Sequence, residues 1–378
     1  MAMKNIDNNS FQMVLNNLVL KKNIKQAILT VENSDRSFQW TGIAGEINQD
    51  DVQVNANSPF FIASIDKIFN ATIIMLLSEQ GKLNLDDPIS DYLPSELFHR
   101  LHTYKGIDYS KKITIRHLLS HTSGLGDWLE DSPKGGKSVV EQILTQGDMA
   151  FSFIDIAEIV RIKLKPHFPP QNPSGRKIKV RYSDTNYILI IALIEAICNA
   201  PLHIVHENML YKPLSLKNTY FPGFSQPLVL TQLPIPLRAG GQIVQIPKLM
   251  KSFRGIYSTT RDMIAFLRKL IQNQVFNKKD TFNIMQNNWN RFGLPLDRAS
   301  LRSPGWPIEY GLGLMRFQLP RIFTSMKKLP EVIGHTGSTG CWLFWCPQLD
   351  LYLCGSVDET SAGAVPYRVI PEILKAMY

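Results

Sequence analysis

The chain has 378 residues, of which 44% are hydrophobic and 19% are charged, and its formal net charge is +9 at pH 7. This composition is typical of a globular protein that can bury one large core or two moderate ones. The longest apolar stretch, Tyr187 to Cys198, contains Glu195 and is too short to cross a bilayer, so we expect no membrane span.

The first predicted elements in chain order are a helix (residues 8–24), a hairpin (28–31 with 38–43) and a strand (60–63) that runs into a helix (64–81). Near the C-terminus we predict three strands (331–336, 341–346 and 351–357) and a closing helix (364–378). Strands at both ends, with helices between them, indicate one sheet domain built from both termini. We expect an α/β (α+β) fold in which an antiparallel sheet is flanked by helices and carries an inserted, mostly helical domain. The expected division is 1–85 and 246–378 for the sheet domain and 86–245 for the insertion.

The N-terminal segment, residues 1–20, has no continuous apolar run and does not resemble a signal peptide. We therefore expect a cytoplasmic protein as the sequence stands, or a periplasmic or secreted one if a signal has been removed. The sequence leaves the oligomeric state open.

Basic residues gather between positions 161 and 181 with no acidic residue among them. No aromatic interleaving or binding motif accompanies them, so we expect a solvated basic loop and no nucleic-acid partner. The alternative is attraction of an anionic substrate, since this loop leads into Tyr182.

Metal and cofactor chemistry have little support in the sequence. His117 and His121 are four residues apart but lack the glutamate and third ligand of a zinc protease. The four cysteines have no zinc-type spacing and are expected as buried free thiols: Cys198, Cys341, Cys346 and Cys354. We predict no metal site and no cofactor.

Ser64 and Lys67 are the first candidate catalytic residues. They lie three positions apart at the expected start of a helix, which places both side chains on one face. A serine beside a lysine in a partly desolvated site can act as a nucleophile. The structural alternative is a serine that caps the helix and a solvated lysine. The S-x-x-K pattern also begins at Ser174 and Ser325, so alone it is a weak signal.

Two further motifs strengthen it: Tyr182-Ser183-Asp184, which precedes an apolar helical run, and His335-Thr336-Gly337 in the C-terminal strands. The order of the three motifs resembles that of the serine β-lactamase and penicillin-binding-protein superfamily, most closely its class C branch. Four further segments also resemble that family: residues 114–125, 182–187, 255–263 and 310–313. The resemblance runs from about residue 25 to the C-terminus.

The resemblance implies a β-lactamase/transpeptidase-like fold with the active site in a cleft between the domains. It implies Ser64 as nucleophile, Lys67 and Tyr182 as the groups that carry its proton, and a strand edge at Thr336 and Gly337 that faces the substrate. By the same analogy, the backbone N–H groups of Ser64 and Ser338 would form the oxyanion hole. Whether Lys67 or Tyr182 is the base stays open.

Two positions depart from the commonest family pattern. Asp184 stands where asparagine is usual, so it would favour a protonated Lys67 and would remove an amide donor to substrate. His335 stands where β-lactamases have lysine, so it would attract a substrate carboxylate more weakly or in a pH-dependent way.

The expected function is that of a serine hydrolase working through an acyl-enzyme on Ser64, with small esters or amides as substrates. A β-lactamase or a D-Ala-D-Ala carboxypeptidase is the alternative within the superfamily. A non-catalytic binding or assembly protein on the same scaffold is the alternative from another class, although it would have no need of Ser64, Lys67 and Tyr182 together.

Overall fold

The computed structural model describes residues 8–45, 55–172, 175, 177–229, 233–295, 297–324 and 326–377. Its main feature is an eight-stranded antiparallel sheet with the order β2-β1-β14-β13-β12-β11-β10-β9. The strands are β1 (Gln26–Asn33), β2 (Gln39–Gly45), β9 (Asn290–Arg291), β10 (Glu309–Tyr310), β11 (Met315–Phe317), β12 (Val332–Thr336), β13 (Trp342–Cys346) and β14 (Leu351–Val357). The predicted hairpin and the three C-terminal strands are therefore confirmed, and β1 joins them through β14.

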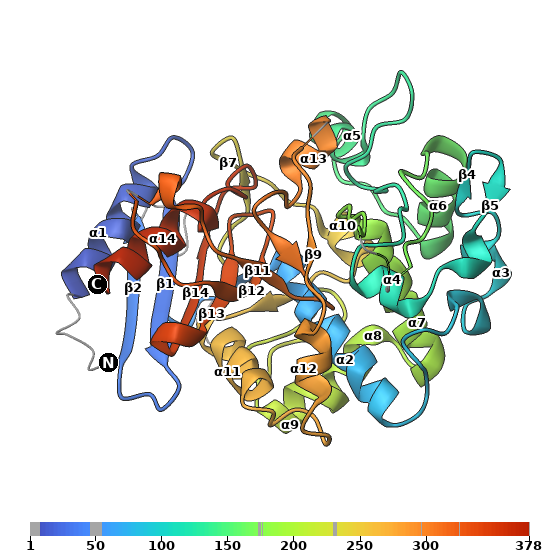
Figure 1. Ribbon diagram of the computed structural model, residues 1–378. Coiled ribbons are helices and arrows are strands. Elements are labelled where there is room, and N and C mark those ends of the chain that lie inside the picture. Colours follow the sequence, from blue (N-terminus) through green and yellow to red (C-terminus); the bar gives the residue numbers. More distant parts are fainter. Residues whose placement is uncertain are drawn as a thin grey trace.

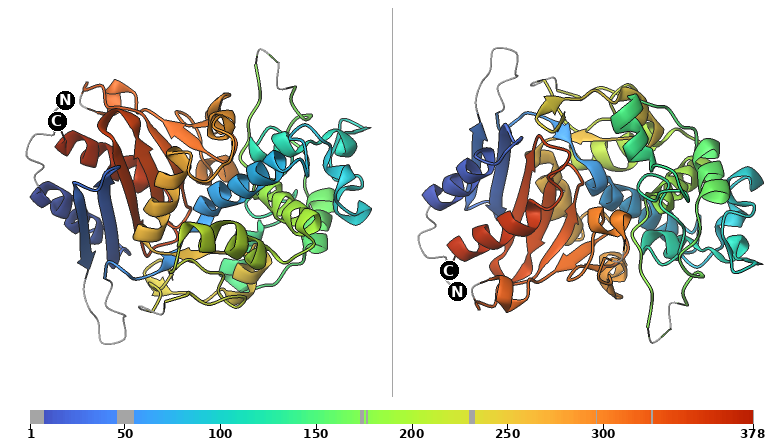
Figure 2. Two further views of the ribbon diagram at one scale, coloured as in Figure 1. Left: turned by 90° about the horizontal axis from the view of Figure 1, so that it is seen from below. Right: turned by 90° about the horizontal axis from the view of Figure 1, so that it is seen from above.

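Helices cover both faces of this sheet (Figure 1). On one face, α1 (Asn8–Val19) and α14 (Pro366–Ala376) pack side by side over the N-terminal and C-terminal strands. On the other face lie α11 (Thr260–Ile271) and the start of α2 (Asp66–Glu79), as the two turned views also show (Figure 2). Both faces are thus buried, which explains why every residue of β1 is buried although neighbouring side chains point to opposite faces.

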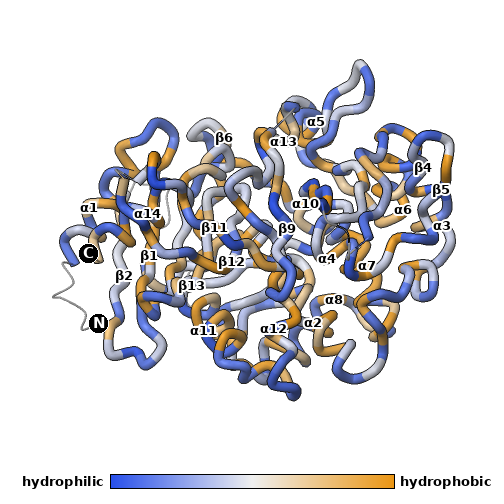
Figure 3. Tube along the Cα trace, viewed as in Figure 1, coloured by the Kyte–Doolittle hydropathy of each residue, from blue (hydrophilic) through white to orange (hydrophobic). Residues whose placement is uncertain are grey.

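Alternate residues of β1 therefore enter different cores. Ile28 joins the core shared with α2 and α11, whereas Leu29 and Val31 join the core beneath α1 and α14. The tube in Figure 3 shows hydrophobic and hydrophilic segments along both α1 and α14, as expected of helices with one face on a sheet. The predicted N-terminal helix ends earlier than expected, at Val19 rather than at residue 24.

The middle of the chain forms a mostly helical region beside the sheet, seen on the right of Figure 1. Its helices are α3 (Ser95–Phe98), α4 (Ile115–Leu119), α5 (Val139–Gln146), α6 (Phe153–Glu158), α7 (Asp184–Cys198), α8 (Leu202–His206) and α9 (Lys212–Leu214). Short strand pairs accompany them: β3 (Phe60–Phe61) with β8 (Tyr257–Ser258), β4 (Thr103–Tyr104) with β5 (Ile107–Asp108), and β6 (Arg238–Ala239) with β7 (Gln242–Ile243). The remaining helices are α10 (Pro247–Ser252), α12 (Thr281–Gln286) and α13 (Arg298–Arg302).

The expected fold class, an antiparallel sheet flanked by helices with a helical insertion, is therefore confirmed. The domain boundaries at residues 85 and 245 stay a prediction. All four cysteines are free; Cys198 is half-buried and the other three are buried.

Among the described helices, no single one is long and apolar enough to cross a membrane; α7 and the helical segment Leu202–Leu214 pass that test only as a pair bent by 75°.

Candidate active site

Ser64 lies where the strand β3 turns into the helix α2. A single 3₁₀ turn, Ala63–Ile65, joins the two, and α2 begins at Asp66. Ala63 has φ +44°, which is a costly conformation for a residue with a side chain and recurs at functional sites. The turn presents a half-buried Ser64 just before the helix, so the predicted place of Ser64 at a helix start is confirmed.

Lys67 connects Ser64 to the start of a second helix. Its Nζ atom lies 3.0 Å from Ser64 Oγ and 2.7 Å from Asp184 Oδ1, the first residue of α7. Burial alone would lower the pKa of Lys67, but its interactions with Asp184, Tyr182 and Asp66 outweigh burial and hold that pKa well above 10.5. Lys67 is therefore an ammonium ion at neutral pH.

Tyr182 lies against Lys67 in the same site. The Lys67 Nζ atom is 5.2 Å from the centre of the Tyr182 ring, and the ring packs on His121 at a centroid distance of 4.3 Å. Its hydroxyl is buried without a hydrogen bond of normal geometry to the described residues, although Ser64 and Lys67 are near enough to lower its pKa. Burial dominates and raises the pKa of Tyr182 far above 10, so the side chain is a neutral phenol.

Two further carboxyl groups flank the Lys67–Asp184 pair. Asp66 is buried 3.9 Å from Lys67, and burial raises its pKa to about 6. Asp127 is also buried, and its Oδ2 atom accepts a hydrogen bond from the backbone N–H of Asp184 at 3.2 Å. Burial, and then the charge of Asp184, raise the pKa of Asp127 well above its usual range. The site is therefore rich in carboxyl groups around one cation.

His335 departs from its expected role. It has no exposed surface, and burial followed by the charge of Lys67 lowers its pKa to about 3. The Nδ1–H group donates to Thr336 O at 2.6 Å, which leaves Nε2 to accept from the Tyr310 hydroxyl at 3.0 Å. A neutral, enclosed imidazole cannot attract a substrate carboxylate in a pH-dependent way, so that expectation is not supported; His335 instead holds Tyr310.

The strand β12 carries the remaining predicted residues to the site. His335 and Thr336 pair with β13, whereas pairing with β11 stops at Gly334, so this end of β12 has a free edge among the described strands. Gly337 follows, and a Cβ atom there would lie 2.8 Å from Ala63 Cβ, so the glycine lets this turn approach Ser64 closely. Thr336 is buried and its Oγ1 atom lies 3.2 Å from the Tyr367 hydroxyl.

Two backbone N–H groups of the predicted site have no hydrogen-bond acceptor among the described residues. Neither Ser64 nor Ser338 donates its backbone N–H to another residue in the part of the chain that the structure describes, and Ser338 is exposed. These are the two donors that the family resemblance assigned to the oxyanion hole. Ser174 and Ser325, the serines of the two other S-x-x-K patterns, lie outside the described residues.

The two histidines of residues 114–125 have structural partners. His117 accepts from the backbone N–H of Thr114 at the start of α4 and bonds Gln171 O through its other nitrogen. His121 Nδ1 accepts from the Ser183 N–H, which ties this segment to the tyrosine motif. Across the described ranges, no group of three metal-ligating side chains is found.

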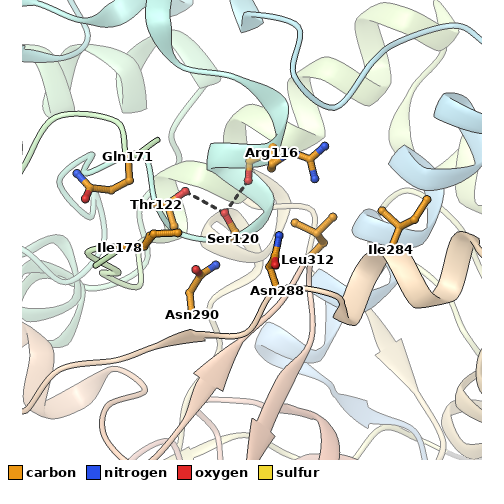
Figure 4. A pocket seen from close by; sticks show the side chains of 9 residues that line it. All are labelled: Arg116, Ser120, Thr122, Gln171, Ile178, Ile284, Asn288, Asn290 and Leu312. Atoms are coloured by element: carbon orange, nitrogen blue, oxygen red, sulfur yellow. Dashed lines mark hydrogen bonds between the residues drawn. The ribbon is translucent and has the colours of Figure 1, made fainter. Parts of the chain in front are cut away.

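Figure 4 shows a small pocket whose lining includes none of the predicted site residues. Its volume of about 30 Å³ suits one or two water molecules rather than a substrate. The lining residues are Arg116, Ser120, Thr122, Gln171, Ile178, Ile284, Asn288, Asn290 and Leu312.

A serine in contact with a lysine at a helix start, a buried tyrosine beside them and a strand with a free edge are the features of a serine hydrolase of the S-x-x-K class. The chain belongs to the beta-lactamase family, whose model matches residues 27–355. This identifies the protein as a hydrolase related to β-lactamases and penicillin-binding proteins.

The chain is similar in sequence to several curated bacterial proteins. The D-alanyl-D-alanine-carboxypeptidase/endopeptidase AmpH of Escherichia coli is 23% identical over 83% of this chain and 73% of its own length. The alignments span only 50% and 66% of the length of two other curated relatives, from Bacillus subtilis and Salmonella typhi.

Solved structures confirm the fold. A D-stereospecific amidohydrolase from Streptomyces sp. has a TM-score of 0.72 and 24% identity, with 98% of each chain covered. A D-amino acid amidase from Ochrobactrum anthropi SV3 has a TM-score of 0.72 at 19% identity, and EstCE1, a hydrolase with promiscuous acyltransferase activity, has 0.70 at 19%; both comparisons cover 98% of each chain.

Sequence reasoning missed three members of the site. Asp66 lies inside the S-x-x-K motif itself, but its burial depends on the packing of α2. Asp127 had no motif to mark it, and only the fold brings it to Asp184. Tyr310 lay within a segment that resembled the family, which was the one available signal for its contact with His335.

Proposed function

We propose that this protein hydrolyses small esters and amides through an acyl-enzyme on Ser64, in preference to β-lactams. The observation that carries the proposal is the 3.0 Å contact between Ser64 Oγ and Lys67 Nζ beside the buried hydroxyl of Tyr182. Ser64 attacks the substrate carbonyl, the N–H groups of Ser64 and Ser338 hold the oxyanion, and water then releases the acyl group.

The preference for uncharged esters and amides follows from the charges of the site. A β-lactam carries a carboxylate that needs a cation or several donors. His335 is neutral and enclosed, and Lys67 is already paired with Asp184 at 2.7 Å. A free carboxylate would therefore meet Asp184 and Asp66 without a cation of its own. The similar structure named as a D-amino acid amidase supports amide substrates, and EstCE1, a hydrolase with promiscuous acyltransferase activity, supports transfer of an acyl group.

The test compares kcat/KM near pH 7.5 for p-nitrophenyl acetate, D- and L-phenylalanine amide, and nitrocefin. We expect the ester or an amide to be the best substrate and Ser64→Ala to be inactive on all of them. A preference for nitrocefin by about tenfold or more would overturn the substrate assignment. Full activity of Ser64→Ala would refute the assignment of Ser64 as the nucleophile. The observed turnover would then be attributed to a contaminant, which would favour the non-catalytic alternative.

A further inference from the structure

The resting site holds no free base next to Ser64. Lys67 is the polar group in hydrogen-bond contact with Ser64 Oγ, and it is an ammonium ion. Tyr182 is a neutral phenol. Because both groups are already protonated, neither can accept the proton that Ser64 must lose when it attacks. A further acceptor is therefore required, and it must connect to Ser64 through one of these two side chains.

Asp184 meets that requirement by geometry. Its Oδ1 atom lies 2.7 Å from Lys67 Nζ, so Ser64 Oγ, Lys67 Nζ and Asp184 Oδ1 form a continuous path of two hydrogen bonds. We propose that Asp184 is the acceptor of the Ser64 proton and receives it through Lys67. This inference rests on the proposed acyl-enzyme function and assigns a proton-transfer role to a residue that sequence reasoning had placed with substrate binding.

The transfer balances at each step. Lys67 first gives a proton to Asp184 Oδ1, and the resulting amine turns its lone pair toward Ser64 Oγ. As Ser64 Oγ then bonds to the carbonyl carbon, its proton passes to Lys67 Nζ, and the carbonyl oxygen takes the negative charge. When the bond to the leaving group breaks, the leaving group takes the Tyr182 hydroxyl proton. Tyr182 regains a proton from Lys67, and Lys67 regains one from Asp184. Water then replaces the leaving group, and the same steps run in reverse.

Several titratable groups face Asp184. From α2 come the cation Lys67 and the buried carboxyl of Asp66; from the segment before α5 come Asp127 and Glu130; Tyr182 lies beside them as a neutral group. Asp127 is held 3.2 Å from the Asp184 backbone N–H. One cation therefore lies among several carboxyl groups, and Asp184 is the one in contact with it at 2.7 Å.

Asp184→Asn separates proton transfer from structure, because an amide oxygen still accepts a hydrogen bond from Lys67 but cannot take its proton. We expect kcat/KM near pH 7 to fall by about 10²-fold or more. The variant must then rely on deprotonated Lys67 or Tyr182, so its rate should climb by about tenfold per pH unit above neutrality, where the wild-type rate is flat. Asp184→Glu, which keeps a carboxylate, should restore the flat profile.

Glu130→Gln is the matched control. It makes the same acid-to-amide change in the same group of carboxyls, but Glu130 pairs with Arg302, whereas Asp184 pairs with Lys67. Its pH profile should keep the wild-type shape. A profile of wild-type shape in Asp184→Asn, whether at full or at uniformly reduced rate, would overturn the proposal. If Asp184→Glu shares the alkaline rise of Asp184→Asn, the carboxylate is not the acceptor and the proposal also fails.

A measurement on the wild-type protein covers the case in which the Asp184 variants do not fold. The acylation rate, followed as the p-nitrophenol burst in mixtures of H₂O and D₂O, should curve with deuterium content because two protons, one from Lys67 and one from Ser64, have moved by the transition state. A linear plot would overturn the relay. Inactive Ser64→Ala with an unaffected Asp184→Asn would reject the relay alone, whereas active Ser64→Ala would reject the acyl-enzyme itself.

Discussion

Replacing Gly337 by alanine should displace one donor of the oxyanion hole. A Cβ atom at this position would lie 2.3 Å from Cys341 Sγ, 2.8 Å from Ala63 Cβ and 2.9 Å from Ile62 O. Ordinary contacts between such atoms are about 3.5–4.0 Å, so the turn must move away from Ser64 by about 1 Å or more. The Ser338 N–H, one residue further along the chain, should move with it.

The expected cost follows from that displacement. Oxyanion donors act over a narrow range of distance, and removal of one typically lowers kcat by about 10²–10³-fold. We therefore expect Gly337→Ala to lose about that factor in kcat on p-nitrophenyl acetate, while KM changes much less. The overpacking should also lower stability by about 1–3 kcal/mol, which thermal unfolding measures separately.

Gly293→Ala provides the matched control. No described atom lies within 4 Å of the Cβ position at Gly293, and its φ is outside the left-handed region. Its kcat should equal that of the wild type. A folded Gly337→Ala protein with kcat within about threefold of the wild type would refute the assignment of Ser338 to the oxyanion hole.

Tyr182→Phe removes only the buried hydroxyl, so kcat on the same ester should fall by about 10²-fold with a smaller change in KM; near-full activity of the folded variant would exclude Tyr182 from proton transfer. Asp66→Asn should change how stability depends on pH. The folded pKa of Asp66, about 6, exceeds its ordinary value of 3.8, so the folded state binds this proton more tightly and loses stability as pH rises from about 4 to above 6. The variant lacks this loss, so its Tm relative to wild type should be higher at pH 7.5 than at pH 4, whereas an equal difference at both would contradict the buried titration.

The sequence predicted the local parts of the site well because each is set by its own motif. Ser64 and Lys67 are three residues apart at a helix start, and this spacing alone brings their side chains together once α2 forms. The C-terminal strands were equally clear, since their apolar runs are separated by turn residues.

The environment of His335 could not be predicted from the sequence. A strand residue faces either the cleft or the core, and the family pattern suggested the cleft. The structure encloses it, and Tyr310, on β10, packs against the ring in an edge-on arrangement and donates a hydrogen bond to it. That contact joins residues 25 positions apart through sheet order, which no local pattern specifies.

The charges around Lys67 show the same limit. Asp184 was expected to favour a protonated Lys67, and the 2.7 Å contact agrees with that expectation. The raised pKa values of Asp66 and Asp127 result mainly from burial. These side chains become buried only when α2, α7 and the segment before α5 pack together. Because both Lys67 and Tyr182 are protonated in the free protein, neither is ready to act as the base.

The most direct test of the account is to label the protein with a fluorophosphonate and to map the adduct by mass spectrometry of the intact chain and its peptides. We predict one adduct per chain, on Ser64, and none on Ser64→Ala. An adduct on another residue, or equal labelling of Ser64→Ala, would contradict the claim that Ser64 is the nucleophile.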